Sequence, residues 1–154
     1  MKSLLSSALA FLAITTATFA AASNADLVTG YVPIAKALAA DDFPAVQAAA
    51  SALSKQAIAG GAAQVGELAR AVAQAGDIAQ ARGALRPLTQ VIEPMAADIK
   101  DVTVMYCPMT RGTWVQAGGP VQNPYHGKVM LACGGPKTAQ KQRPAIAAAA
   151  LRRA

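Results

Sequence analysis

Residues 27–97 repeat apolar side chains at helical spacing, and this pattern limits the fold more than any other feature of the chain. The stretch is rich in alanine and poor in β-branched residues, which favours helices. Four segments with apolar positions three and four residues apart are separated by turn residues at 41–42, 60–61 and 76–77. Each segment therefore has one apolar face to bury. The sequence predicts a mainly α fold, an antiparallel helical bundle of about four helices.

The fourth segment carries the longest apolar stripe, which runs to Ile99 at steps of three and four residues. Pro87 and Pro94 lie inside this segment but off its stripe. A proline removes one intrahelical hydrogen bond and costs roughly 3 kcal/mol in a regular helix interior. We therefore expect a kink or break near one of them. Met95 lies on the stripe, which indicates a packing role.

The composition changes after Asp101, where glycine, proline and β-branched residues replace the alanine-rich pattern. Short strands are predicted at residues 102–106, 113–116 and 128–131, in a small C-terminal β-hairpin and loop layer. Trp114 is expected to be the aromatic plug of that layer. The basic, alanine-rich tail at residues 137–154 is expected to be a loose helix or disordered.

The N-terminus has the three regions of a secretory signal peptide in the right order. Lys2 is followed by an apolar core at residues 4–14 and by small residues up to Ala22. The core is about half of the ~20 residues that a membrane-spanning helix needs. We expect cleavage after Ala20 or Ala22, a periplasmic product without a membrane span, and one domain at residues 23–136.

Charge is distributed unevenly along the expected mature chain. Residues 23–101 carry six basic and eight acidic side chains, whereas residues 102–154 carry seven basic and no acidic ones. Such a C-terminal segment attracts anions, acidic proteins or an anionic membrane surface, although solubility alone also explains it. Export argues against nucleic acid as a partner.

The unusual sulfur-containing residues are concentrated in two short pieces, Cys107-Pro108-Met109 and Met130-Leu131-Ala132-Cys133. Each offers a thiolate and a thioether, which are soft donors that suit Cu(I) and Ag(I). His126 adds a possible imidazole donor. Zinc fits less well, because its four-coordinate sites favour Cys and His and this chain has two Cys and one His. Spacing alone favours a different interpretation, a structural disulfide between the only two cysteines.

Two stretches, residues 27–55 and 106–134, resemble the domain-of-unknown-function family 3347. The first resembles the pattern Y-x-x-L-x-x-A-L-x-x-D-D, with Ile34 at its first leucine. The second, YCPMTRGTWVQAGGPVQNPYHGKVMLACG, resembles the more specific signature H-C-P-M-A…G-x-W-L…N-P-Y-x-G-x-x-M-L-x-C-G. This family occurs as small exported proteins and as an accessory domain of periplasmic adaptor proteins in copper and silver efflux pumps.

The resemblance implies a periplasmic module that binds Cu(I) or Ag(I), with an efflux adaptor or another envelope protein as partner. Its ligands would be the Cys107 and Cys133 thiolates and the Met109 and Met130 thioethers, with His126 as an optional further donor. Two departures from the signature affect the predicted ligand set. Tyr106 replaces the histidine before the first cysteine, and His126 replaces an aromatic residue after N-P-Y.

Two other functional classes compete with metal binding as interpretations of the sequence. One is a non-metal interaction domain stapled by a Cys107–Cys133 disulfide, in which the methionines are packing residues. The other is an enzyme, which we do not expect, because no residues are arranged for acid–base or nucleophilic work and no acidic residue follows Asp101 to orient His126.

Overall fold

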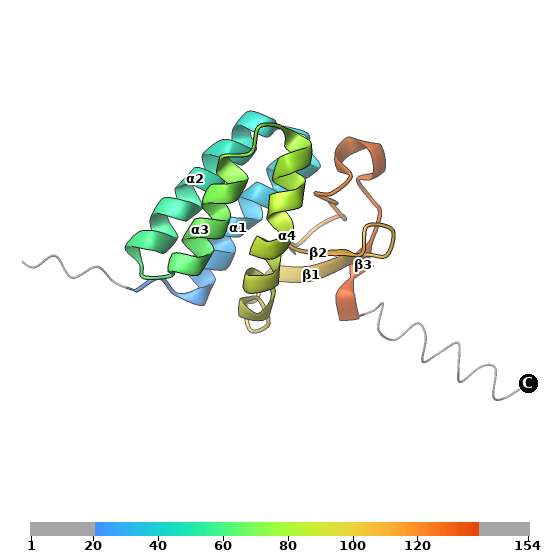
Figure 1. Cartoon of the computed structure of the whole chain (residues 1–154). Helices are drawn as coiled ribbons and strands as arrows, with labels where there is room; N and C mark the ends of the chain where they lie inside the picture. Colours follow the sequence, from blue (N-terminus) through green and yellow to red (C-terminus); the bar gives the residue numbers. More distant parts are fainter. Residues whose placement is uncertain (1–20, 139–154) are drawn as a thin grey trace, which may run out of the picture.

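The structure is a computed structural model that describes residues 21–138. The α-helices lie between Asn24 and Met95. Its four α-helices are α1 (Asn24–Ala39), α2 (Phe43–Ala59), α3 (Ala63–Ala73) and α4 (Ile78–Met95). Helices α1 and α3 each contact both α2 and α4 (Figure 1). The prediction of a mainly α fold is confirmed. The predicted signal peptide and basic tail lie outside the described residues, apart from residues 21–22 and 137–138.

Three of these helices begin at side-chain caps. Ser23 and Asp26 form a capping box at the start of α1. Asp42 caps α2 through the Ala45 amide, and Asp77 caps α4 through the Gln80 amide. An aspartate in this position accepts a hydrogen bond from a backbone amide that has no partner within the helix. Both aspartates belong to the turns that the sequence predicts between the helices.

Prolines are accommodated on the outer faces of the helices. Helix α4 continues through Pro87 and ends one residue after Pro94, so a break occurs near only the second of these residues. Pro33 likewise lies within α1. All three rings are exposed, so that water can hydrogen-bond the carbonyls that lack an intrahelical donor.

The main core lies among the four helices and includes Val115 from the sheet. At its centre, the buried Tyr31 hydroxyl of α1 is 2.6 Å from the Thr89 hydroxyl of α4. Burial raises the pKa of Tyr31 far above its ordinary value, so the phenol stays neutral. No helix within residues 21–138 combines the length and apolarity needed to cross a membrane.

A small antiparallel sheet follows the helices. Its strands are β1 (Val102–Cys107), β2 (Gly112–Ala117) and β3 (Gly135–Pro136), in the spatial order β2-β1-β3. Both α1 and α4 contact β2, so the sheet packs beside these two helices (Figure 1). The strands predicted at residues 102–106 and 113–116 are confirmed.

The strand predicted at residues 128–131 is wrong. These residues overlap a 3-10 helix, η1 (Gly127–Met130). The Lys128 amide donates to Asp41 Oδ2 at 3.0 Å instead of to a strand partner. Val129 is 87% exposed, so its apolar side chain was a misleading indicator of a buried strand face. The third strand is β3, which the sequence pattern did not indicate.

Candidate functional site

The two cysteines meet at one end of the sheet. Cys107 is the last residue of β1 and is fully buried, whereas Cys133 follows η1 and is half-buried. Both are free thiols, and their Sγ atoms are 3.0 Å apart. The antiparallel pairing of Tyr106 with Gly135 brings the chain after Cys133 alongside the end of β1. The register of the sheet thus brings together two thiols that are 26 positions apart in sequence.

A second, smaller core surrounds the thiols. Met105, Cys107 and Trp114 are its buried members, and Cys133 packs against them. Trp114 is fully buried and donates its Nε1 hydrogen to Gln116 Oε1 at 3.0 Å. The prediction that Trp114 plugs the C-terminal layer is confirmed.

The hairpin turn after β1 forms a cradle for the Cys107 sulfur. Burial raises the pKa of the Cys107 thiol, but several hydrogen bonds together outweigh it and lower the pKa to about 7. Their sources are the Cys133 thiol, the Thr110 backbone and hydroxyl, and the Met109 backbone. The Thr110 hydroxyl is buried and has no hydrogen-bond partner within the described residues, so it is available to donate to a Cys107 thiolate. The pKa of Cys133 is raised, chiefly because its thiol donates to Cys107. The pair therefore favours one thiolate and one thiol near neutral pH.

The ionisation of Cys107 leads to a prediction for the reduced protein. The thiolate absorbance is expected to rise with a midpoint near pH 7, and Cys133→Ala is expected to move that midpoint upward because a hydrogen-bond donor is lost. Because folding lowers this pKa from 9.0, the stabilisation by Cys107 is full above about pH 9 and is lost as the pH falls through about 7. Urea unfolding of the reduced wild-type protein between these pH values tests the sign. A midpoint that Cys133→Ala leaves unchanged would show that Cys133 does not stabilise the thiolate.

The loop before Cys133 is fastened to the helices by Arg82 of α4. Its Nε donates to the Pro124 carbonyl at 2.9 Å, and its Nη2 donates to the Leu38 carbonyl at 3.1 Å and forms an ion pair with Asp41. Asp41 also accepts the Lys128 amide. This bond and the Arg82 guanidinium lower the pKa of Asp41. Sequence reasoning gave Asp41 only a role at the end of a helix and missed Arg82 entirely.

Asn123 connects this loop directly to Cys133. Its side chain is fully buried, and Nδ2 donates to the Cys133 carbonyl at 2.7 Å. Its Oδ1 accepts the Tyr125 amide at 2.8 Å, which forms a tight turn. The backbone of Asn123 also bonds Leu131 and Gly127. Asn123 therefore determines where the Cys133 backbone lies.

Arg86 and Tyr125 support the hairpin that follows Cys107. The Arg86 guanidinium lies 4.6 Å from the centre of the Tyr125 ring, and its Nη2 donates to the Thr110 carbonyl at 3.2 Å. The Tyr125 hydroxyl donates to the Thr113 carbonyl at 2.6 Å, and its ring meets Trp114 edge to face. These contacts hold the turn that contains the Cys107 cradle.

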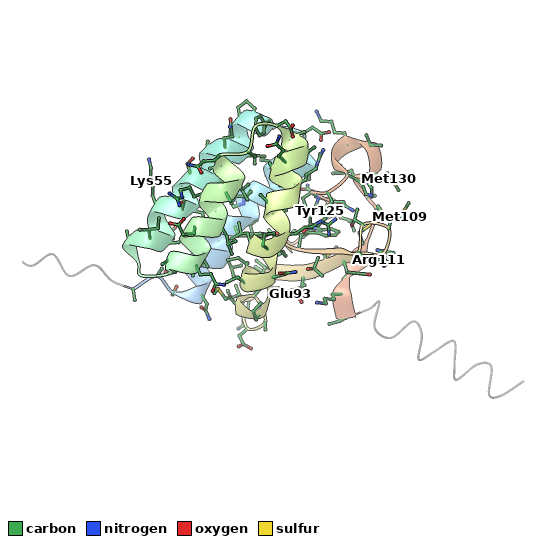
Figure 2. All side chains as sticks on the ribbon, viewed as in Figure 1. Lys55, Glu93, Met109, Arg111, Tyr125 and Met130 are labelled. Atoms are coloured by element: carbon green, nitrogen blue, oxygen red, sulfur yellow. The ribbon has the colours of Figure 1, made fainter. Side chains whose placement is uncertain are left out.

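The other predicted donors are less closely assembled than the cysteines. Met109 is 67% exposed in the hairpin turn, and Met130 is half-buried at the end of η1. Figure 2 shows both on the same side of the molecule. His126 Nε2 is enclosed and has no hydrogen-bond partner within residues 21–138. No group of three or more His, Cys, Asp or Glu side chains in that range could hold a metal ion, so His126 does not form such a group with the cysteines.

The sulfur separation falls between the values for two chemical states. A disulfide requires about 2.0 Å. Two thiolates on one ion, each about 2.3 Å from it, lie about 3.5 to 4.5 Å apart. At 3.0 Å the thiols are in contact and must separate by about 1 Å to enclose an ion, or approach by about 1 Å to form a bond. The donor chemistry fits a soft ion, and a small movement gives either state.

No family model, curated protein or solved structure matches the chain. The resemblance to family 3347 consequently remains a prediction from sequence motifs. The function proposed below rests on the cysteine pair and its surroundings.

Proposed function

We propose that this protein is an exported module that binds Cu(I) or Ag(I) through the thiolates of Cys107 and Cys133. The observation that carries the proposal is the 3.0 Å approach of two free thiols from separate segments, one of them in a cradle of hydrogen-bond donors. Soft monovalent ions prefer thiolates, and a thiol with its pKa lowered to about 7 loses its proton readily on metal binding.

Binding would require the sulfurs to separate, and Cys133 is the partner better placed to move. Cys107 is buried at the end of β1, whereas Cys133 is half-buried in an irregular segment. Rotation of the Cys133 side chain would provide roughly 1 Å of opening. Met109 and Met130 would then supply thioether ligands from the exposed side, and His126 an optional nitrogen ligand.

In this proposal the four helices, as an antiparallel bundle, form a rigid support for a binding site and carry out no catalysis. The expected signal peptide would deliver the chain to the periplasm, where soft metals are handled. The resemblance to accessory domains of heavy-metal efflux adaptors suggests an adaptor or another envelope protein as the partner for metal transfer.

A Cu(I) titration against a competing chelator tests this function. The reduced protein is expected to bind one ion, and a Cys107→Ser, Cys133→Ser double variant is expected to lose at least a hundredfold in affinity, because two soft anionic ligands are replaced by hard neutral ones. Met95→Leu is the matched control, since Met95 packs against the helical core. Equal affinity of the double variant and the wild type would exclude the cysteines as ligands.

A second candidate function is favoured by the same short sulfur separation. A Cys107–Cys133 disulfide would staple a non-metal interaction domain by closing a loop of about 27 residues, worth roughly 3 to 4 kcal/mol in the chain-entropy model. A free-thiol count on protein taken from the periplasm separates the candidates. A fully oxidised pair that takes up no metal after reduction would favour the staple.

A further inference from the structure

We propose that the cysteine pair carries out directional thiol–disulfide exchange with thiol and disulfide partners, in which Cys133 is the sulfur that is attacked and Cys107 is the leaving and resolving thiolate. The partners are small-molecule or protein thiols and disulfides. This activity goes beyond metal binding and needs no metal.

The direction follows first from the unequal exposure of the two sulfurs. Cys107 is 0% exposed and lies in the small core beside Met105 and Trp114. Cys133 is half-buried and follows a turn closed by its own amide, which donates to the Met130 carbonyl at 3.0 Å. An incoming sulfur must approach along the S–S bond axis, and that approach is open only at the more exposed end.

The surroundings of Cys107 provide the second argument. The turn after β1 places the Met109 and Thr110 backbone and the Thr110 hydroxyl beside its sulfur, and this hydroxyl is buried without a hydrogen-bond partner within residues 21–138. Arg86 holds this turn in place through the Thr110 carbonyl. Hydrogen bonds to a sulfur anion stabilise it as a leaving group. Among the described residues, the Cys133 sulfur is hydrogen-bonded only to Cys107.

Reduction of the pair takes two successive thiolate attacks. A thiolate of the reductant attacks Cys133 Sγ in the Cys107–Cys133 disulfide, forms a new S–S bond and breaks the old one. The electron pair of the broken bond goes to Cys107 Sγ, which leaves as a thiolate in its cradle. A second thiolate of the reductant then releases Cys133, and the reductant departs as a disulfide. The same steps in reverse oxidise the pair at the expense of a partner disulfide.

One consequence rests on the proposed metal function. Only the reduced pair offers two thiolates, so exchange at Cys133 would switch metal binding on and off. The exchange can nevertheless be tested without any metal, and either proposal can fail while the other stands.

The test uses the full mature chain, oxidised and then treated with glutathione. Samples are quenched in acid at short times, and the mixed disulfide is located by peptide mass spectrometry. Glutathione is expected on Cys133, with Cys107 free, in at least tenfold excess over the opposite adduct. Predominant attachment to Cys107, an equal mixture, or failure of the pair to oxidise would overturn the proposal.

Two threonine variants test the cradle. Thr110→Val removes a donor to Cys107 and is expected to slow reduction by glutathione about tenfold without changing the attacked sulfur. Thr113→Val lies on the same hairpin, where Tyr125 bonds only its backbone carbonyl, and is expected to leave the rate within about twofold of wild type. Equal rates for the two variants would show that the cradle does not stabilise the leaving thiolate.

Discussion

Replacing Gly134 by alanine is expected to lower the free energy of unfolding by about 3 to 5 kcal/mol. Gly134 has a φ of +123°, which side chains with a Cβ rarely adopt. An added Cβ would also lie 2.8 Å from the Tyr106 carbonyl oxygen and 2.8 Å from the Trp114 ring. The first contact is with the backbone of the central strand, so a side-chain rotation cannot relieve it. Because Gly134 follows Cys133 directly, the variant should also displace that thiol.

Gly118 and Gly119 separate the two causes of this loss of stability, which are the positive φ and the close contacts of the added Cβ. Gly119 has nearly the same φ, +118°, but an added Cβ would meet nothing within 4 Å, so Gly119→Ala should cost only about 1 to 3 kcal/mol. Gly118 has the same open space without the positive φ, and Gly118→Ala should change stability by about 0.5 kcal/mol or less. Urea unfolding of the three reduced variants provides the measurement. Equal losses for Gly134→Ala and Gly119→Ala would mean that close packing at Gly134 contributes nothing.

The helical part of the fold was predictable because its determinants are local. A helix face requires only apolar residues three and four positions apart, and a cap requires only an aspartate before the first turn, as at Asp42 and Asp77. The error at residues 128–131 has the opposite origin. There, the conformation depends on Asp41, which lies 87 positions earlier and accepts the Lys128 amide. A local pattern cannot contain such a partner.

The candidate site was predictable in chemistry and only partly in geometry. Cysteine and methionine identify soft donors from residue type alone, but the meeting of Cys107 and Cys133 depends on the register between β1 and the two-residue strand β3. Such a short strand has no periodicity to detect. The cradle at Met109 and Thr110 is made largely of backbone groups and is therefore invisible in side-chain patterns.

Asn123→Ala is expected to destabilise the protein by about 2 to 4 kcal/mol and to weaken Cu(I) binding together with stability. The substitution removes the bonds from Nδ2 to the Cys133 carbonyl and from the Tyr125 amide to Oδ1. Alanine leaves both backbone partners unsatisfied in a partly buried loop, and each loss costs about 1 to 2 kcal/mol. The Cys133 backbone would no longer be tied to the turn at Asn123, so the two sulfurs would lose their fixed approach.

Two further variants distinguish a positioning role for Asn123 from general damage to the loop. Asn123→Asp keeps an acceptor for the Tyr125 amide but places an oxygen against the Cys133 carbonyl. It should therefore retain the turn and still impair the thiol pair. Gln122→Ala is the matched control, because only the backbone amide of Gln122 bonds Gln116, and its stability should stay within about 0.5 kcal/mol of wild type. The measurements are urea unfolding, Cu(I) competition and the rate of disulfide formation from the reduced protein. If Asn123→Asp formed the disulfide and bound Cu(I) as wild type does, the bond to the Cys133 carbonyl would have no part in positioning the thiol.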